Sequence, residues 1–376
     1  MLRTTTCAGR TGRWPWIALL LACAMVAAGC GGGEPAADAE GGDAASEQAD
    51  AGAAADDDAG DDAAGELEEV VVSMPVVPPN FVMIQPWVAQ EQGFYDKFGV
   101  PVEIISLETG IAALRGAQAG SADVGAAPTP ALIAANAEGA VVKGYYTYSP
   151  GLEAQMVVTE DVQSCEDLEG KVLGVDEVGG FAEVLTRAVY TSCGLTQDDV
   201  QYQSFPGAEG QAMAQGQAVS GILHIDEAEN VMRQFPDAGL HVLADLWETV
   251  PLWHYAAYAS PQDVLEGKRD SIVAFTAGNV CATRYMQDTA NRDAVVAFAA
   301  ELTEVPEDIV GTTYDVFVED EIWPDDHGLP QDMIEFTGQQ QVELGAIEEA
   351  ELPAYEDVVD LTIYEDATAL IDEQGC

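Results

Sequence analysis

The stretch that most constrains the fold is residues 101–146, where strand, loop and helix patterns follow one another twice. Residues 101–106 alternate between apolar and polar side chains as a strand does, and apolar residues recur at helical spacing after Thr109. Thr129 and Pro130 are typical of the start of a second helix. Such strand-helix-strand units predict a parallel sheet, whose ligands bind where the strands end and helix N-termini offer free amides.

The chain begins with a segment that is typical of export. Three arginines precede a short apolar run, which ends in small residues before Cys30. This ending resembles a bacterial lipoprotein signal, although Ala27 stands where that pattern has leucine. We therefore predict a signal peptide over residues 1–29 and Cys30 as the lipidated first residue of the mature chain. Lipidation at Cys23 and a soluble-secretory or uncleaved signal are the alternatives.

Residues 30–66 consist almost entirely of Ala, Gly, Asp and Glu and contain no Lys, Arg or aromatic residue. Such a composition buries too little apolar surface to offset the entropy of ordering. We expect a disordered, acidic lipoprotein tether here.

The whole chain is strongly acidic, with 13 Lys and Arg against 66 Asp and Glu and a formal net charge of −53. This balance excludes nucleic acid as a partner, because phosphate binding requires a basic surface. Evenly spread carboxylates keep a protein soluble in concentrated salt, where their repulsion is screened. We ascribe the charge to such a solvent; a cationic ligand is the alternative.

Four cysteines remain in the segment that follows the tether, in an exported protein that permits disulfides. Cys165 precedes a strand and Cys193 ends the helix that runs back beside it, which favours a Cys165–Cys193 disulfide. Cys281 would then pair with Cys376, although four cysteines allow three pairings. The spacing matches neither a zinc site nor a catalytic thiol, so we expect no metal and no cofactor.

Several short motifs, in order, resemble one family. They are Ala89-Gln-Glu-Gln-Gly-Phe-Tyr95, Phe98-Gly-Val-Pro-Val-Glu-Ile105, Gly120-Ser-Ala-Asp-Val-Gly125, Asp167-Leu-Glu-Gly-Lys-Val-Leu-Gly174, Gly194-Leu-Thr-Gln-Asp-Asp-Val200 and Gly239-Leu-His-Val-Leu-Ala-Asp245. This order resembles solute-binding proteins of ABC importers, in the type II group that binds nitrate, sulfonates, taurine and thiamine-pyrimidine precursors. The resemblance covers about residues 70–260.

The resemblance implies a two-lobed type II periplasmic-binding-protein fold of the α/β class, each lobe a mixed, mainly parallel sheet flanked by helices. At 376 residues the chain has room for two such cores. We expect residues 67–150 and 256–376 to form domain I and residues 151–255 to form domain II, linked by two crossing segments.

If two domains close on a ligand, the strand-end loops and crossing segments line the site. The candidate ligand-binding residues are Asn80, Phe81, Thr109, Gly110, Pro128, Thr129, Tyr146, Gly179, Gly180, Phe181, His224, Asp226, Glu227, Trp253 and Tyr255. Each has a structural alternative: the aromatic residues as core, the threonines and Asp226 as helix caps, and His224 as a buried core histidine. We expect no catalytic residue.

The charge of the ligand can be argued in two directions. Free helix N-termini favour an anion. However, the loops contain no Lys or Arg, while Asp226, Glu227 and many aromatic residues favour a small nitrogenous aromatic molecule such as a thiamine-pyrimidine precursor. Sulfonates, taurine or nitrate are the alternative.

The resemblance implies a non-catalytic, extracytoplasmic receptor that is anchored to the membrane by lipid. It would act as a monomer and deliver a small molecule to an ABC permease and its ATPase, since this chain has no GxxxxGK[ST] phosphate loop. An enzyme of thiamine-pyrimidine synthesis and an extracytoplasmic sensor are the competing hypotheses. Export and the scarcity of lysine argue against the enzyme.

Overall fold

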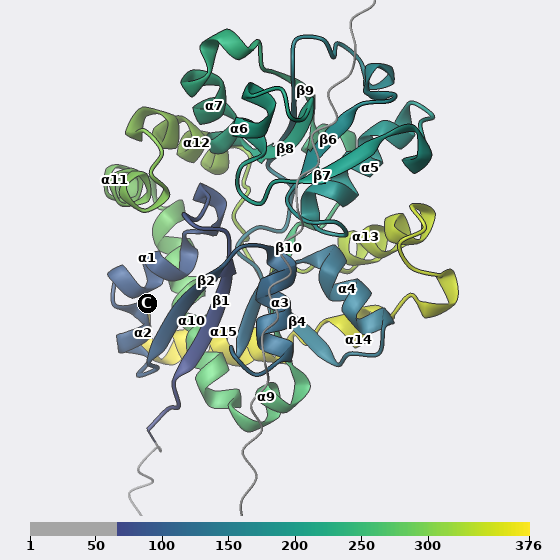
Figure 1. The fold of residues 1–376 in the computed structure, drawn as a ribbon. Helices are drawn as coiled ribbons and strands as arrows, with labels where there is room; N and C mark the ends of the chain where they lie inside the picture. Colours follow the sequence, from purple (N-terminus) through teal and green to yellow (C-terminus); the bar gives the residue numbers. More distant parts are fainter. Residues whose placement is uncertain (1–65) are drawn as a thin grey trace, which may run out of the picture. The chain divides into compact units, whose positions relative to one another are not determined.

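The structure is a computed structural model that describes residues 66–376, all within one unit of the chain, Ala63–Cys376. The expected signal peptide, the candidate lipidation site Cys30 and the tether up to residue 65 lie outside the described residues. The strands of the described part form two groups (Figure 1). We call the part built on the first group lobe one and the part built on the second group lobe two.

Lobe one contains a five-stranded sheet of order β2-β1-β3-β10-β4. β1 is parallel to β2 and β3, as the strand-helix-strand units predict, whereas β10 is antiparallel to β3 and β4. All residues of β3 are buried, because helices cover both faces of the sheet (Figure 1). The strands are β1 Val70–Pro75, β2 Val102–Leu107, β3 Val124–Pro128, β4 Val142–Tyr146 and β10 Ala256–Pro261.

Lobe two contains a three-stranded sheet of order β8-β5-β9 and the pair β6-β7. Within lobe two, the three-stranded sheet and the pair β6-β7 are joined by a hydrogen bond, in which the Val219 N–H donates to the Val172 carbonyl at 2.9 Å. β6 is parallel to β7, and β5 is antiparallel to β8 and β9. The strands are β5 Ala154–Val158, β6 Val172–Val175, β7 Gln201–Ser204, β8 Ser220–His224 and β9 His241–Asp245.

The strands β5 and β10 run antiparallel to all their neighbours for one shared reason. Each follows a segment that connects the lobes, and so enters its sheet from the side at which the neighbouring strands end. The structure therefore has the mixed α/β fold that the sequence predicts. The domain boundaries at residues 150 and 255 stay a prediction.

Helices follow the strands and cover the sheets (Figure 1). Up to β10 they are α1 Gln85–Glu91, α2 Phe94–Lys97, α3 Gly110–Gln118, α4 Thr129–Ala137, α5 Phe181–Ser192, α6 Glu209–Ala214, α7 Ile225–Gln234 and α8 Leu246–Thr249. After β10 they are α9 Gln262–Gly267, α10 Arg269–Gln287, α11 Arg292–Thr303, α12 Glu307–Glu319, α13 Gln331–Glu343, α14 Tyr355–Val358 and α15 Thr362–Gln374.

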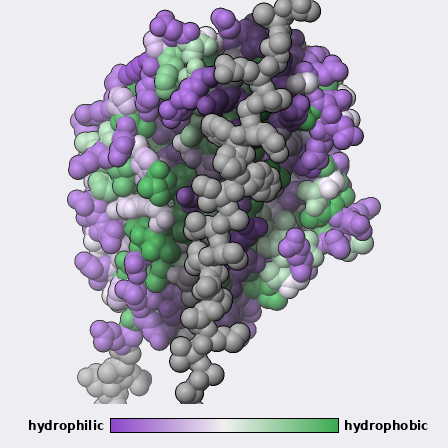
Figure 2. All heavy atoms as spheres, viewed as in Figure 1, coloured by the Kyte–Doolittle hydropathy of each residue, from purple (hydrophilic) through white to green (hydrophobic). Residues whose placement is uncertain are grey.

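The helices after β10 contact both lobes. α10 packs against α1, α2 and α15 there, but α12 contacts α7 of lobe two. Across that contact Arg233 forms an ion pair with Asp308 at 2.8 Å. Within residues 66–376 no helix has both the length and the apolar character that a membrane span requires. Hydrophilic side chains cover much of the face in Figure 2, in keeping with the acidic composition.

Candidate functional site

A cavity of about 400 Å³ lies between the lobes, where strands of both sheets end. Pro75 and Pro128, the last residues of β1 and β3, line it from lobe one. His224, the last residue of β8, and Asp176, which follows β6, line it from lobe two. Small-molecule sites commonly have volumes of roughly 300–1,000 Å³. The cavity is therefore large enough for a small organic molecule.

Most candidate residues lie around this cavity. Those that line it are Asn80, Thr109, Gly110, Pro128, Phe181, His224, Asp226, Glu227 and Tyr255. Gly110 has to be glycine, because a Cβ atom there would lie 2.2 Å from Pro128 Cδ. Thr109 caps α3 by accepting from the Ala112 N–H at 3.1 Å, and its hydroxyl donates to Glu177 at 2.6 Å.

Other candidate residues are buried away from the cavity. The Tyr146 hydroxyl donates to Thr283 at 3.0 Å inside lobe one, and its ring stacks on Tyr364 with 5.7 Å between centroids. Phe81 packs its ring against Phe317 and Trp323. Trp253, on the segment that leads back to lobe one, is 1% exposed and also lies outside the cavity lining. These aromatic side chains belong to the core, which was their structural alternative.

Thr129 is also buried, and its hydroxyl is used inside the protein. It lies 2.6 Å from Nδ1 of His254, whose Nε2 lies 2.7 Å from the Gly328 carbonyl. A carbonyl oxygen only accepts, so Nε2–H donates to it and Nδ1 accepts from Thr129. Burial lowers the pKa of His254 to about 4, which keeps the ring neutral. Thr129 thus holds the connecting segment in place and does not line the cavity.

Gly179 and Gly180 lie at the start of α5 but do not line the cavity. The Gly179 N–H donates to the Glu183 carboxylate at 3.0 Å, and the Ala182 N–H donates to Asp176 at 3.2 Å. Protein carboxylates therefore accept from two of the amides at the helix N-terminus that the sequence suggested for an anionic ligand. This weakens the argument for an anion at this helix N-terminus.

Aromatic rings form one wall of the cavity. Phe181 stacks on His224, with 5.6 Å between centroids and 8° between planes, and lies 4.9 Å from the ring of Tyr255. Tyr148 meets Tyr255 edge to face at 5.7 Å. His224 Nδ1 hydrogen-bonds to Glu153; burial opposes a charge on the imidazole, but this carboxylate raises the pKa of His224 to about 9.

Carboxyl groups form another wall. Asp176, Glu209, Asp226 and Glu227 line the cavity, and among residues 66–376 no Lys or Arg does so. Burial raises the pKa of Glu209 to about 8, that of Glu227 to about 7 and that of Asp176 to about 6, and it also raises the pKa of Asp226. The cavity therefore combines aromatic faces with acidic groups that no lining Lys or Arg neutralises.

The sequence argument missed part of the lining. Asp176 and Glu209 follow strands β6 and β7, so the strand-end argument applied to every strand finds them. Thr303 and Val305, at the end of α11, also line the cavity. No sequence signal connects them with the other lining residues, because only the packing of α12 on α7 brings them there.

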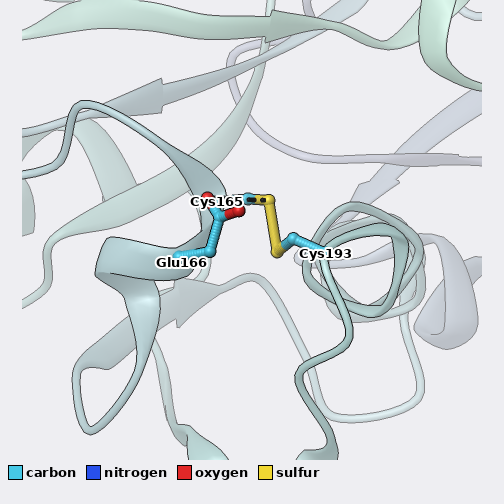
Figure 3. A group of neighbouring side chains, drawn as sticks. All are labelled: Cys165, Glu166 and Cys193. Carbon is cyan, nitrogen blue, oxygen red and sulfur yellow. Dashed lines mark hydrogen bonds between the residues drawn. A yellow bond between two sulfur atoms is a disulfide. The ribbon is translucent and has the colours of Figure 1, made fainter.

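The four cysteines form two disulfides, Cys165–Cys193 and Cys281–Cys376, with Cα atoms 6.2 and 5.4 Å apart. These are the pairs that the sequence favours. Cys165, Glu166 and Cys193 are also the one described group whose possible metal-ligand atoms all lie within 4.8 Å of one another (Figure 3). Their two sulfur atoms are bonded to each other, so neither is a free thiolate for a metal.

Residues 80–291 match the model of the NMT1/THI5-like family. The chain belongs to this family. The match extends from Asn80 at the cavity to just beyond α10, so it includes most of the cavity lining. No curated protein matches the chain.

Solved structures share the fold of this NMT1/THI5-like chain. The periplasmic nitrate-binding protein NrtA from Synechocystis PCC 6803 aligns with a TM-score of 0.69 and 13% identity, covering 82% of this chain and 91% of that one. A ligand-binding component of an ABC-type import system from Staphylococcus aureus, with zinc bound, aligns at 0.66 and 10%, covering 80% and 99%. The alkanesulfonate-binding protein SsuA from Xanthomonas axonopodis pv. citri, bound to MOPS, aligns at 0.62 and 15%, covering 78% and 96%.

These alignments confirm the type II periplasmic-binding fold and the resemblance noted in the sequence. At such low identities a shared fold carries no information on which solute this NMT1/THI5-like protein binds. The solute has to be argued from the cavity itself.

Proposed function

We propose that this protein is the solute-binding component of an ABC importer and captures a small nitrogenous aromatic molecule, such as a thiamine-pyrimidine precursor, between its lobes. The observation that carries the proposal is the lining of the cavity, with aromatic faces beside carboxyl groups and no Lys or Arg among the described residues. An aminopyrimidine ring stacks on such faces and donates to carboxylates. Nitrate or a sulfonate would instead lie against Asp226 and Glu227, and the one cation of the lining, His224, is already paired with Glu153.

The transport role is supported by the family and by the fold of the compared structures. We propose that the protein is exported, carries a lipid at Cys30 and acts as a monomer with a permease and an ATPase. Replacing Cys30 with Ala should release the protein from the membrane fraction, whereas Cys23→Ala should not. The reverse result would move the anchor to Cys23.

The alternative of an enzyme has little support from the cavity. His224 has both ring nitrogens engaged, Nδ1 with Glu153 and Nε2 with the Tyr255 hydroxyl at 3.3 Å. No lysine among the described residues lines the cavity, so no amine is placed there to form a covalent intermediate.

Isothermal titration calorimetry tests the proposed ligand class. Thiamine-pathway pyrimidines, taurine, alkanesulfonates and nitrate would each be titrated into the mature protein. We expect binding by a pyrimidine without turnover, and binding at least about tenfold weaker, or 1.4 kcal/mol, for taurine, the alkanesulfonates and nitrate. Tighter binding of nitrate or a sulfonate would contradict the proposed ligand class, and turnover of a bound pyrimidine would contradict the role as a receptor.

A further inference from the structure

We infer that Glu209, Asp226 and Glu227 form a subsite for a positively charged group of the solute. The inference rests on the proposed solute-binding function and adds a charge to the ligand, which is therefore an organic cation. All three side chains line the cavity from lobe two, Glu209 at the start of α6 and the other two in the first turn of α7.

Asp226 provides the observation that points to a ligand. Its side chain is buried, with 1% of its surface exposed, and Oδ2 accepts from the Phe81 N–H at 3.2 Å. Oδ1 is also buried and has no hydrogen-bond partner among the described residues. A buried carboxylate oxygen without a donor is costly, and a cationic N–H group in the cavity would supply the missing donor.

The surrounding residues supply this subsite with one cation, His224, which is already paired with a carboxylate. His224 on β8 already pairs with Glu153 on β5, and Asp176 after β6 adds another carboxyl group. The arginines of the neighbouring helices are paired elsewhere: Arg187 with Glu183, and Arg233 with Glu229 and Asp308. A bound cation is therefore the natural partner of the three carboxyl groups.

The neighbouring aromatic wall indicates that the cation is organic. Phe181 and Tyr255 present ring faces and edges to the same cavity, and such faces attract desolvated cations. The three carboxyl groups are not arranged as a metal site, because their oxygen atoms are not among those described that converge within 4.8 Å. A planar cation with N–H donors fits both walls at once.

Binding of such a cation should release protons. Burial raises the pKa of Glu209 to about 8 and that of Glu227 to about 7, so both carry protons for much of the time at neutral pH in the absence of ligand. A cation nearby favours the ionised carboxylates. The affinity should therefore rise between pH 6 and pH 8, by up to about tenfold per pH unit for each proton released.

A series of three probes of nearly equal shape separates charge from fit. Benzamidinium, benzamide and benzoate carry charges of +1, 0 and −1 on the same ring, and each would be titrated into the full mature chain by calorimetry in two buffers of different ionisation enthalpy. We expect benzamidinium to bind about tenfold or more tighter than the other two, with proton release. Asp226→Asn should weaken benzamidinium binding about tenfold, because Asn keeps the acceptor for Phe81 but loses the charge.

Glu229→Gln is the matched control, since Glu229 lies on the same helix, pairs with Arg233 and is not part of the cavity lining. It removes the same charge from the protein and should leave the affinity unchanged. Glu209→Gln is a second test variant, which should weaken benzamidinium binding and lower the proton release, should Asp226→Asn fail to fold.

Three outcomes would overturn the inference. Benzamide or benzoate could bind as tightly as benzamidinium, or Glu229→Gln could lose as much affinity for benzamidinium as the test variants do. The third outcome is that benzamidinium does not bind at about 10 mM. The proposed function would survive each of them if a neutral or anionic solute still bound in the pyrimidine and oxyanion titrations. It would fail separately if none of those solutes bound.

Discussion

Residues of one type at equivalent places in the sequence have different roles in this protein. Thr109 and Thr129 both lie between the end of a strand and the body of a helix, Thr109 just before α3 and Thr129 as the first residue of α4. Thr109 caps α3 and lines the cavity, whereas Thr129 turns its hydroxyl to His254 inside the protein. The difference comes from His254, which lies 125 residues further along the chain.

The substitution Thr129→Val tests this distinction. Valine keeps the volume but removes the donor to His254 Nδ1, which would leave a buried nitrogen without a partner. We expect the free energy of unfolding to fall by about 1–3 kcal/mol in urea titrations, with the ligand affinity nearly unchanged. Thr312→Val is the control, because the Thr312 side chain is exposed. This substitution should lower the free energy of unfolding only slightly. A large loss of affinity without destabilisation would instead make Thr129 a ligand contact.

At the scale of single elements, the ends of helices determine which chemical groups line the cavity. The first turns of α5 and α7 are supplied with carboxylates by the protein, which compensate the positive ends of the helix dipoles. The end of α11 places Thr303 and Val305 at the cavity, with Glu304 between them in the left-handed region at φ 60°. A residue with a Cβ atom is strained there.

Glu304→Gly should therefore stabilise the protein. Glycine adopts the left-handed conformation without the Cβ penalty, and the Glu304 side chain is exposed, so few contacts are lost. We expect a gain of about 0.5–1 kcal/mol in the free energy of unfolding, measured by denaturant titration. Glu301→Gly, inside the same helix, should have the opposite sign, because a glycine there costs about 1 kcal/mol. Destabilisation by Glu304→Gly would mean that its conformation is not strained.

At the scale of the whole molecule, a few polar contacts join the lobes at the cavity. The Thr109 hydroxyl donates to Glu177 of lobe two, whose carboxylate also lies 3.5 Å from Arg115 of lobe one. The Phe81 N–H of lobe one likewise donates to the Asp226 carboxylate of lobe two. These contacts join the lobes around the cavity, in agreement with the proposed closure on a solute.

Glu177→Ala should favour an open arrangement of the lobes. It removes both contacts made by the Glu177 carboxylate, and Glu177 itself does not line the cavity. We expect a larger radius of gyration by small-angle X-ray scattering without ligand, and an affinity about threefold to tenfold lower. Glu138→Ala, at the far end of α4, controls for the loss of one charge. Unchanged scattering together with unchanged affinity would show that these contacts do not affect closure.

Without ligand, the stability of the folded protein should fall as the pH rises from 6.5 to 8. Burial raises the pKa of Glu209 to about 8 and that of Glu227 to about 7. Burial opposes a charge on His224, but the neighbouring Glu153 carboxylate raises the pKa of His224 to about 9. In this window the native state therefore binds more protons than the unfolded state, so the free energy of unfolding decreases with pH. His254, with its pKa lowered to about 4, acts in the opposite direction mainly below this window, because an unfolded histidine loses its proton near pH 6.5.

Each fully shifted group contributes about 1.4 kcal/mol per pH unit, so the loss should amount to a few kcal/mol in denaturant titrations. Glu209→Gln should reduce the slope, and a saturating cationic ligand should reverse part of it. A free energy of unfolding that is constant from pH 6.5 to 8 would contradict the protonated state of these carboxyl groups.

The sequence by itself determined the class of fold and the region of the site. Alternation in residues 101–106 and the threonine and proline at helix starts are local signals, which depend on neighbouring residues alone and predict strands followed by helices. The resemblance to a two-lobed fold added the expectation that strand ends such as Pro128 and His224 meet at one cavity. The favoured disulfide pairs followed in the same way from the ends of adjacent elements.

Only the tertiary structure decided which side of each strand end faces the ligand. Rings such as Tyr146 and Trp253 entered the core, and Thr129 bonded to His254, because these contacts join residues far apart in the chain. The same packing gathered four carboxyl groups around one cavity and buried two of them, Glu209 and Asp226, and no local pattern specifies that arrangement. Burial and pairing depend on what lies opposite a residue in space, and a sequence read along its length contains no such information.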